Sequence, residues 1–327
     1  MNYRKLGKSG IEISEISLGT WQVGGRWGDE FSHTNADRIL NSAVDNGINF
    51  IDTADVYSDG ESEKAVGRLV NSRKEKLFVA SKCGRRLNPH TNEAYTEKAL
   101  RNFVEDSLGR MKIERLDLIQ LHCPPTQVYY RPEIFGLFEK LKDEGKIANL
   151  GVSVEKVEEA LKAIEFENVV SVQIIFNMFR QRPAELFFKE AAKRNVGIIA
   201  RVPLASGALT GKYSKDMQFG PDDHRNFNRN GAAFDKGETF SGIDFDTVID
   251  AVEELKNIFP GKEISLVALK WILMFKEISC VIPGASRVEQ LLSNLKAIDL
   301  PPLTENEMNG IEKIYNQRIK KNVHQLW

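Results

Sequence analysis

The sequence predicts an α/β chain that closes into a (β/α)8 TIM-type barrel, with an N-terminal β-hairpin, a long loop after the seventh strand and an extra C-terminal helix. Three observations favour this fold class: short apolar runs recur along the chain, charged amphipathic stretches separate them, and the runs number eight. Such a barrel needs about 250 residues. The 327 residues of this chain leave room for the additions.

The predicted strands are short apolar segments bounded by polar or turn-forming residues. In chain order they lie at residues 15–20, 48–54, 77–84, 116–123, 148–153, 169–177, 196–204 and 278–285. A run that is apolar throughout is typical of a parallel strand buried on both faces. We therefore expect helices to cover the outside of the sheet.

The predicted helices show apolar residues at three- and four-residue spacing, which is typical of one buried face. They lie around residues 36–46, 61–72, 96–111, 132–145, 155–165 and 184–195, and the extra helix lies around residues 303–321. Several end in Asn or Gly, which tolerate a left-handed stop. Residues 212–244 are rich in Gly, Asp and Asn and predict the long loop, a length that usually serves function.

The charge balance favours a small-molecule partner. Lys and Arg number 45 against 46 Asp and Glu, which leaves a formal net charge of −1. Nucleic-acid binding depends on clustered basic side chains, so we expect no nucleic-acid partner. No apolar run approaches the roughly 20 residues that cross a bilayer, and the first ten residues lack an apolar signal core. We therefore expect a cytoplasmic protein without membrane contact.

The cysteines indicate a reducing environment. Cys83, Cys123 and Cys280 are odd in number and far apart, which fits neither a disulfide framework nor a CxxC metal site. We expect buried thiols and no metal. No segment rich in Pro or Ser divides the chain, so residues 1–327 are predicted to form a single domain. The oligomeric state stays open.

A doubly wound open sheet is the alternative fold. For a dinucleotide it predicts a Gly-x-Gly-x-x-Gly turn after the first strand, but the glycines of residues 19–28 have the wrong spacing. Residues 206–213, SGALTGKY, are one residue short of a phosphate loop and end in Tyr213 where a magnesium-binding Ser or Thr is needed. Neither segment matches, and the barrel is preferred.

Four polar residues follow apolar runs at the end of the barrel where active sites are built. Asp52, Lys82 and His122 each close a predicted strand, and Tyr57 follows Asp52 by five residues. Each alone also fits a structural role, as a cap, a surface charge, a packed imidazole or a packed ring. Together they form an acid catalyst with its tuning groups.

The four residues suit protonation of a developing alkoxide. A free phenol has a pKa of about 10, and a neighbouring ammonium favours the phenolate, so we expect Lys82 to lower the pKa of Tyr57. Asp52 would hold the Lys82 ammonium in place and keep it protonated. His122 would orient a substrate carbonyl by donating a hydrogen bond.

The sequence resembles the aldo-keto reductase family over nearly the whole chain, from LGKSG near residue 6 to SNL near residue 295. The matching stretches are INFIDTADVY, LFVASK, LDLIQLH, GVS, VVSVQIIFN, VPLASGALTGKY and VIPGA. The resemblance implies an NADP(H)-dependent reductase of aldehydes or ketones, or the reverse alcohol dehydrogenase, with NAD(H) as the alternative cofactor. Tyr57 would give the proton while hydride passes from C4 of the nicotinamide, and Asp52, Lys82 and His122 would take the family's other catalytic roles.

The resemblance also implies a cofactor cleft along the rim of the barrel. Its residues would be Thr20, Trp21, Ser153, Gln173, Arg201, Pro203, Leu204, Ser206, Gly207, Lys212, Arg225, Gly284, Ser286, Arg287, Gln290 and Asn294. Ser153 and Gln173 would meet the carboxamide, and Arg225 or Arg287 the 2′-phosphate. For the substrate, we expect Trp21, Trp27, Tyr57, Arg85 and His122.

Some positions depart from the family pattern. Val154 stands where Asn is common, and Gln290 and Ser293 replace an Arg and an acidic residue, which weakens the basis for NADP over NAD. Arg201 stands where many members carry an aromatic residue that stacks on the nicotinamide. Its guanidinium plane can also stack, and its charge would favour the reduced ring.

Two other functions compete with carbonyl reduction. A regulatory subunit could bind NADPH and signal to a partner with little turnover, although a pure sensor has no need of all four catalytic residues. An aldolase or isomerase could use Lys82 as a Schiff base. That lysine would need a lowered pKa, and Asp52 would raise it.

Overall fold

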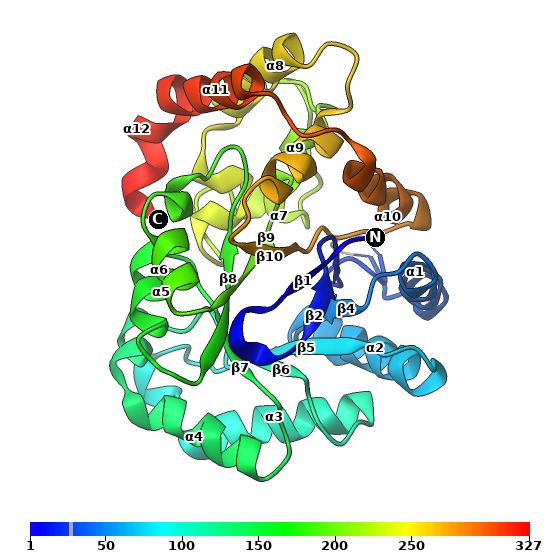
Figure 1. Cartoon of the computed structure of the whole chain (residues 1–327), viewed down its shortest axis with the longest axis vertical. Helices are drawn as coiled ribbons and strands as arrows, with labels where there is room; N and C mark the ends of the chain where they lie inside the picture. The colour runs from blue at the N-terminus through cyan, green and yellow to red at the C-terminus, as the bar shows by residue number, and fades with distance from the viewer. Residues whose placement is uncertain (26–28) are drawn as a thin grey trace.

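A closed ring of eight parallel strands forms the centre of the protein. The computed structural model describes residues 1–25 and 29–327. The strands pair in the order β3 to β10, each with its neighbour in the chain. Parallel bridges at Ile16–Val281 and Gly19–Gly284 join the two ends of this sheet. The predicted (β/α)8 barrel is confirmed (Figure 1).

All eight predicted strands are present, each shorter than its apolar run. They are β3 (Leu18–Gly19), β4 (Phe50–Asp52), β5 (Phe78–Cys83), β6 (Leu118–His122), β7 (Leu150–Ser153), β8 (Val169–Ile175), β9 (Gly197–Arg201) and β10 (Ile278–Val281). Every residue of these strands is buried, because the barrel interior lies on one side and the helices on the other.

The helices surround the strands (Figure 1). They are α1 (His33–Asp45), α2 (Glu61–Ser72), α3 (Glu97–Met111), α4 (Pro132–Asp143), α5 (Val157–Ala163), α6 (Phe187–Lys193), α7 (His224–Phe227), α8 (Phe245–Ile258), α9 (Ile264–Leu273), α10 (Val288–Leu295), α11 (Glu305–Ile314) and α12 (Lys320–Val323). A π-helical turn over Tyr315–Ile319 joins α11 to α12. These two helices and that turn form the predicted C-terminal addition.

The predicted N-terminal hairpin closes one end of the barrel. Strands β1 (Tyr3–Lys5) and β2 (Glu12–Ser14) pair antiparallel and cross the centre of the ring in Figure 1. Leu6 and Ile13 from the hairpin pack with Phe50, Phe78 and Leu118 of the barrel strands in a fully or nearly fully buried cluster. Side chains therefore fill this end, and the opposite end is left for a ligand.

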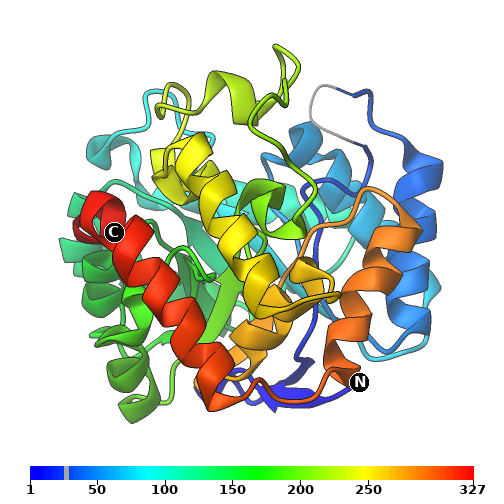
Figure 2. The same cartoon turned by 90° about the horizontal axis from the view of Figure 1, so that it is seen from above.

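The predicted long loop after β9 lies at the end of the barrel away from the hairpin (Figure 2). It is not without structure, since it contains α7 and 3-10 turns over Ala205–Thr210, Lys236–Glu238 and Phe240–Gly242. The C-terminal Trp327 packs against this loop, because its ring is 4% exposed and would lie 2.6 Å from a Cβ atom on Gly242.

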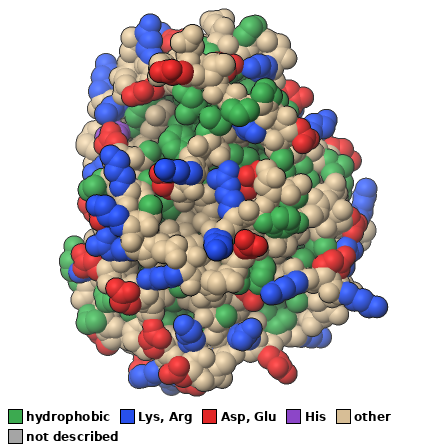
Figure 3. All heavy atoms as spheres, viewed as in Figure 1, with side chains coloured by type: hydrophobic (Ala, Val, Ile, Leu, Met, Phe, Trp, Pro, Cys, Tyr) green, Lys and Arg blue, Asp and Glu red, His purple; other side chains and the backbone are tan. Residues whose placement is uncertain are grey.

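The surface carries both signs of charge. Figure 3 shows basic and acidic side chains interspersed over the face that bears the hairpin, in keeping with the net charge of −1. Among the described residues, none of the helices combines the length and apolarity that a membrane crossing requires.

The packing of α2 against α3 can be tested by substitution. A Cβ atom on the buried Gly67 would lie 2.3 Å from the Met111 carbonyl oxygen, so Gly67→Ala must push the two helices apart. We expect it to lower the free energy of unfolding by about 1–3 kcal/mol in urea denaturation. Gly136→Ala is the matched control, because its exposed helical site has no atom within 4 Å. It should instead stabilise by about 0.5–1 kcal/mol, and equal effects of both variants would contradict the packing account.

Candidate active site

The carboxyl ends of three neighbouring strands bring the predicted catalytic residues together. Asp52 ends β4, Lys82 is the penultimate residue of β5, and His122 ends β6. Parallel pairing places the ends of adjacent strands at the same rim. Register pairs Lys82 with Gln120, and His122 with Ser153.

The Lys82 ammonium is the centre of the site. Its Nζ donates to Asp52 Oδ2 at 2.5 Å, to the Thr53 carbonyl at 2.8 Å and to the Tyr57 hydroxyl at 3.2 Å. The side chain is fully buried. These three acceptors match the three donors of an ammonium, so its orientation is fixed.

The second carboxylate oxygen of Asp52 also accepts hydrogen bonds. Oδ1 accepts hydrogen bonds from Gln120 Nε2 at 3.0 Å and from Gln173 Nε2 at 2.8 Å. Gln120 is absent from the predicted site. It lies two residues before His122 on the same strand, so the two-residue period of a strand could have found it.

Burial governs the protonation of the site. Burial is the largest single influence on Lys82 and opposes its ionisation, but Asp52 and Tyr57 together outweigh burial, so the pKa of Lys82 is raised, as expected from the sequence. For Tyr57 the expected direction is wrong. Desolvation raises the pKa of the Tyr57 phenol above its ordinary value, and the Lys82 ammonium only opposes this rise. The Tyr57 phenol is therefore neutral and keeps its proton at neutral pH.

Aromatic rings surround the Tyr57 phenol. The His122 ring meets it edge-on at 6.2 Å between centroids, and the Trp21 ring stacks on its other side at 6.4 Å. Burial and the charge of Arg85 hold the pKa of His122 well below its usual range, so the imidazole is neutral. Trp21 also lies 5.3 Å from the His224 ring of α7, which joins the first loop to the long excursion.

The turn after β9 follows the barrel rim with an unusual backbone. Positive φ angles occur at Val202, Ala205, Ser206 and Gly207. The Ser206 hydroxyl donates to the Glu238 carbonyl at 2.9 Å and accepts from the Phe240 amide at 3.1 Å. Five predicted cofactor residues lie in or next to this turn: Pro203, Leu204, Ser206, Gly207 and the exposed Lys212.

A second group of predicted cofactor residues lies at the start of α10. Gln290 Oε1 accepts from the Ser286 amide at 2.9 Å and from its hydroxyl at 3.0 Å, which fixes this loop. Ser286 and Arg287 line an open cavity of about 340 Å³ together with Asp29 and Glu30. Gly284 pairs with Gly19 across the barrel seam, and Asn294 is buried.

The remaining predicted residues have separate places. Thr20 is buried, and its hydroxyl donates to the Asp52 carbonyl and accepts from Ser62, so it supports the strand end. Ser153 ends β7 and is buried. Arg225 donates to Asp223 and to the Tyr213 hydroxyl. Trp27 lies outside the described residues.

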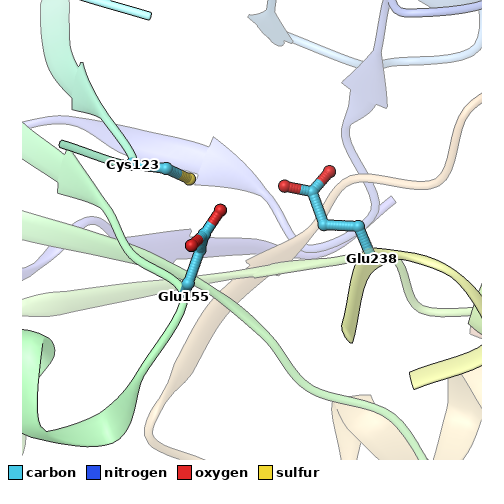
Figure 4. A group of neighbouring side chains, drawn as sticks. All are labelled: Cys123, Glu155 and Glu238. Carbon is cyan, nitrogen blue, oxygen red and sulfur yellow. The ribbon is translucent and has the colours of Figure 1, made fainter. Parts of the chain in front are cut away.

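A charged cluster adjoins the catalytic group on the side of β9. Arg201, which ends β9, pairs with Glu238 at 3.5 Å, and Arg85 pairs with Glu238 at 3.3 Å and Glu155 at 3.8 Å. Figure 4 shows both carboxylates turned toward each other and toward Cys123. Acidic groups with a thiol resemble a metal-ligand set, but two guanidinium groups already neutralise them here. Glu238 is absent from the predicted site, since it lies in an irregular segment without a periodic signal.

Asp55 is a buried acid two residues before Tyr57. It is fully buried, and neither carboxylate oxygen has a hydrogen-bond partner among the described residues. Burial and the nearby Glu63 raise its pKa to about 7.

Comparisons with known proteins find relatives that match nearly the whole chain. The model of the aldo/keto reductase family matches residues 15–316. An uncharacterized oxidoreductase of Bacillus subtilis, YqkF, is 29% identical over 98% of this chain and 99% of its own. A probable voltage-gated potassium channel subunit beta of Arabidopsis thaliana is 26% identical over 98% of each chain. The solved holo form of aldo-keto reductase AKR11C1 from Bacillus halodurans matches with a TM-score of 0.78 and 26% identity, covering 99% of both chains.

Asp55 predicts a pH-dependent stability. With a folded pKa of about 7 against an ordinary 3.8, the folded state binds this proton more tightly than the unfolded state does. The contribution of Asp55 to the unfolding free energy is therefore greatest at low pH and falls as pH rises from about 4 to 7. Asp55→Asn has no carboxyl group to bind this proton. The melting temperature of the variant minus that of the wild type should therefore increase from pH 5 to pH 8. A difference that is the same at both pH values would show that Asp55 does not carry this proton.

Proposed function

The chain belongs to the aldo/keto reductase family, whose members are oxidoreductases of carbonyl and alcohol groups, and on this premise we propose that it is an NADP(H)-dependent reductase. It would reduce an aldehyde or ketone to an alcohol, or run in reverse, with Tyr57 as general acid and base. One observation carries the proposal: the Tyr57 hydroxyl lies 3.2 Å from a buried ammonium, that of Lys82, which Asp52 holds in place.

In this proposal Tyr57 supplies the proton, and its neighbours stabilise the phenolate that is left. The neutral phenol donates its proton to the carbonyl oxygen as negative charge develops there, and the phenolate left behind lies beside the Lys82 ammonium. The neutral His122 imidazole is placed to donate a hydrogen bond to the same oxygen. Bound reduced nicotinamide would supply the hydride to the carbonyl carbon.

The residues of the rim fit a dinucleotide. Arg201 is 8% exposed and its buried Nε has no partner among the described residues, so its guanidinium retains a donor at the place assigned to the nicotinamide. The turn over Ala205–Thr210 would hold the pyrophosphate, with Lys212 as the nearby charge. Ser153 and Gln173 remain our candidates for the carboxamide, although the Gln173 amide group already donates to Asp52.

The 2′-phosphate is better served by Arg287 than by Arg225. Arg225 is bound to Asp223 and Tyr213, whereas Arg287 lines the cavity at the start of α10 and makes no ion pair among the described residues. A guanidinium without a carboxylate partner suits a phosphate. This supports NADP(H), whereas Asp29 and Glu30 line the same cavity and would favour NAD(H), the alternative cofactor. Gly284, Gln290 and Asn294 would shape the adenosine end.

The substrate is a small carbonyl compound or alcohol that reaches Tyr57 between aromatic walls. Trp21 and His122 flank the phenol and would form these walls. Arg85 is bound to Glu238 and Glu155, so we place it in the support of the site rather than on an anionic substrate.

A regulatory subunit with little turnover is the second candidate. It is favoured by the similarity to the probable potassium channel subunit, a relative that aligns over 98% of its own length. The complete set of Asp52, Tyr57, Lys82 and His122 favours the enzyme, because binding alone does not need them. Turnover of an aldehyde panel at background level, with intact NADPH binding, would decide for the regulatory role.

Replacement of Tyr57 by Phe tests the enzyme directly. Without the phenolic proton, kcat for NADPH-dependent aldehyde reduction should fall by about 10²–10⁴, while the Kd for NADPH changes less than about twofold. Tyr129→Phe is the matched control, because the Tyr129 hydroxyl is buried without a hydrogen-bond partner among the described residues. It should keep wild-type kcat. Unchanged turnover in Tyr57→Phe would remove Tyr57 from its role.

A further inference from the structure

The Arg201 guanidinium is held by contacts with three neighbouring residues. Its Nη2 donates to the Val154 carbonyl at 3.1 Å and lies 3.6 Å from Cys123 Sγ, while Nη1 pairs with Glu238 at 3.5 Å. Only 8% of the residue is exposed. A charge buried to this degree is costly unless it is paired. Glu238 is its ion-pair partner among the described residues.

Glu238 bridges two guanidinium groups with one carboxylate. Its side chain is 12% exposed, and it contacts both Arg201 and Arg85. Burial opposes its ionisation, but the charges of Arg201 and Arg85 outweigh burial and lower its pKa. Its backbone is fixed by the Ser206 hydroxyl in the turn after β9. Figure 4 shows the carboxylate reaching in from the long excursion toward the strand ends.

The charge of Arg201 matters because the nicotinamide changes charge during the reaction. The oxidised ring carries a positive charge and the reduced ring is neutral, so an uncompensated guanidinium beside it repels only the oxidised form. A fixed carboxylate paired with the guanidinium cancels much of this repulsion in a medium of low dielectric. The nearby Glu155 is a weaker compensator, since burial and the charges of Asp235 and Glu238 raise its pKa to about 7.

We propose that Glu238 is the charge-compensating residue that allows Arg201 to serve both redox states of the nicotinamide, and that it thereby sets the ratio of affinities for the oxidised and reduced cofactor. The proposal rests on the proposed function, which places the nicotinamide against Arg201. Glu238 acts through Arg201 and is a positioning residue. It does not itself touch the cofactor.

The test is a pair of binding constants for each variant of the full chain. Isothermal titration with NADP⁺ and with NADPH gives the Kd for NADP⁺ divided by the Kd for NADPH, without any turnover. Glu238→Gln keeps the volume and removes the charge, so this ratio should rise about tenfold, mainly through weaker NADP⁺ binding. Arg201→Gln should lower the ratio, because the repelling charge is gone. The double variant removes both opposite charges, so its ratio should lie between those of the two single variants and within about twofold of the wild-type ratio.

Two controls separate the charge effect from structural damage. Glu155→Gln changes a neighbouring carboxylate that pairs with Arg85, and the Kd ratio should change less than about twofold. Equal weakening of both nucleotides in Glu238→Gln, or an unchanged ratio in Arg201→Gln, would overturn the proposal. If Glu238→Gln does not fold, the Arg201→Gln result alone decides. Wild-type protein that binds neither nucleotide would instead contradict the proposed function.

Discussion

The structure depends on the burial of one ammonium group. Lys82 carries its charge into the end of the barrel, where an unpaired ion would be strongly destabilising. The chain meets this constraint with Asp52 on the adjacent strand, the Thr53 carbonyl and the Tyr57 hydroxyl. Asp52 in turn is bound by two amides, so every donor and acceptor of the pair has a partner. The Tyr57 hydroxyl is therefore hydrogen-bonded to a charged group that residues of the barrel strands hold in place.

Two ion pairs with different proposed roles lie at this rim. The Lys82–Asp52 pair places a positive charge beside Tyr57, where negative charge would appear if the phenol gives up its proton as we propose. The Arg201–Glu238 pair instead balances a positive charge close to the place that we propose for the nicotinamide. The first pair is built from two barrel strands. The second joins a strand end to the long excursion, so proton transfer and cofactor preference can vary separately.

The sequence was sufficient to predict the barrel and the proximity of Asp52, Lys82 and His122, because both follow from local patterns. All eight apolar runs form strands, and parallel pairing brings Asp52, Lys82 and His122 to one rim. The direction of the Tyr57 pKa could not be predicted, since it depends on how much water the fold removes from the phenol. Glu238 was also beyond reach, because its partners Arg85 and Arg201 lie far from it in the sequence.

A double-mutant cycle between Lys82 and Tyr57 tests the central claim most directly. The single-turnover rate of NADPH oxidation by an aldehyde is measured for wild type, Lys82→Met, Tyr57→Phe and the double variant, with melting temperatures recorded in parallel. If the Lys82 ammonium acts through the phenol, Lys82→Met slows the wild type at least about tenfold but slows Tyr57→Phe by less than about twofold. The same loss in both backgrounds would contradict the account.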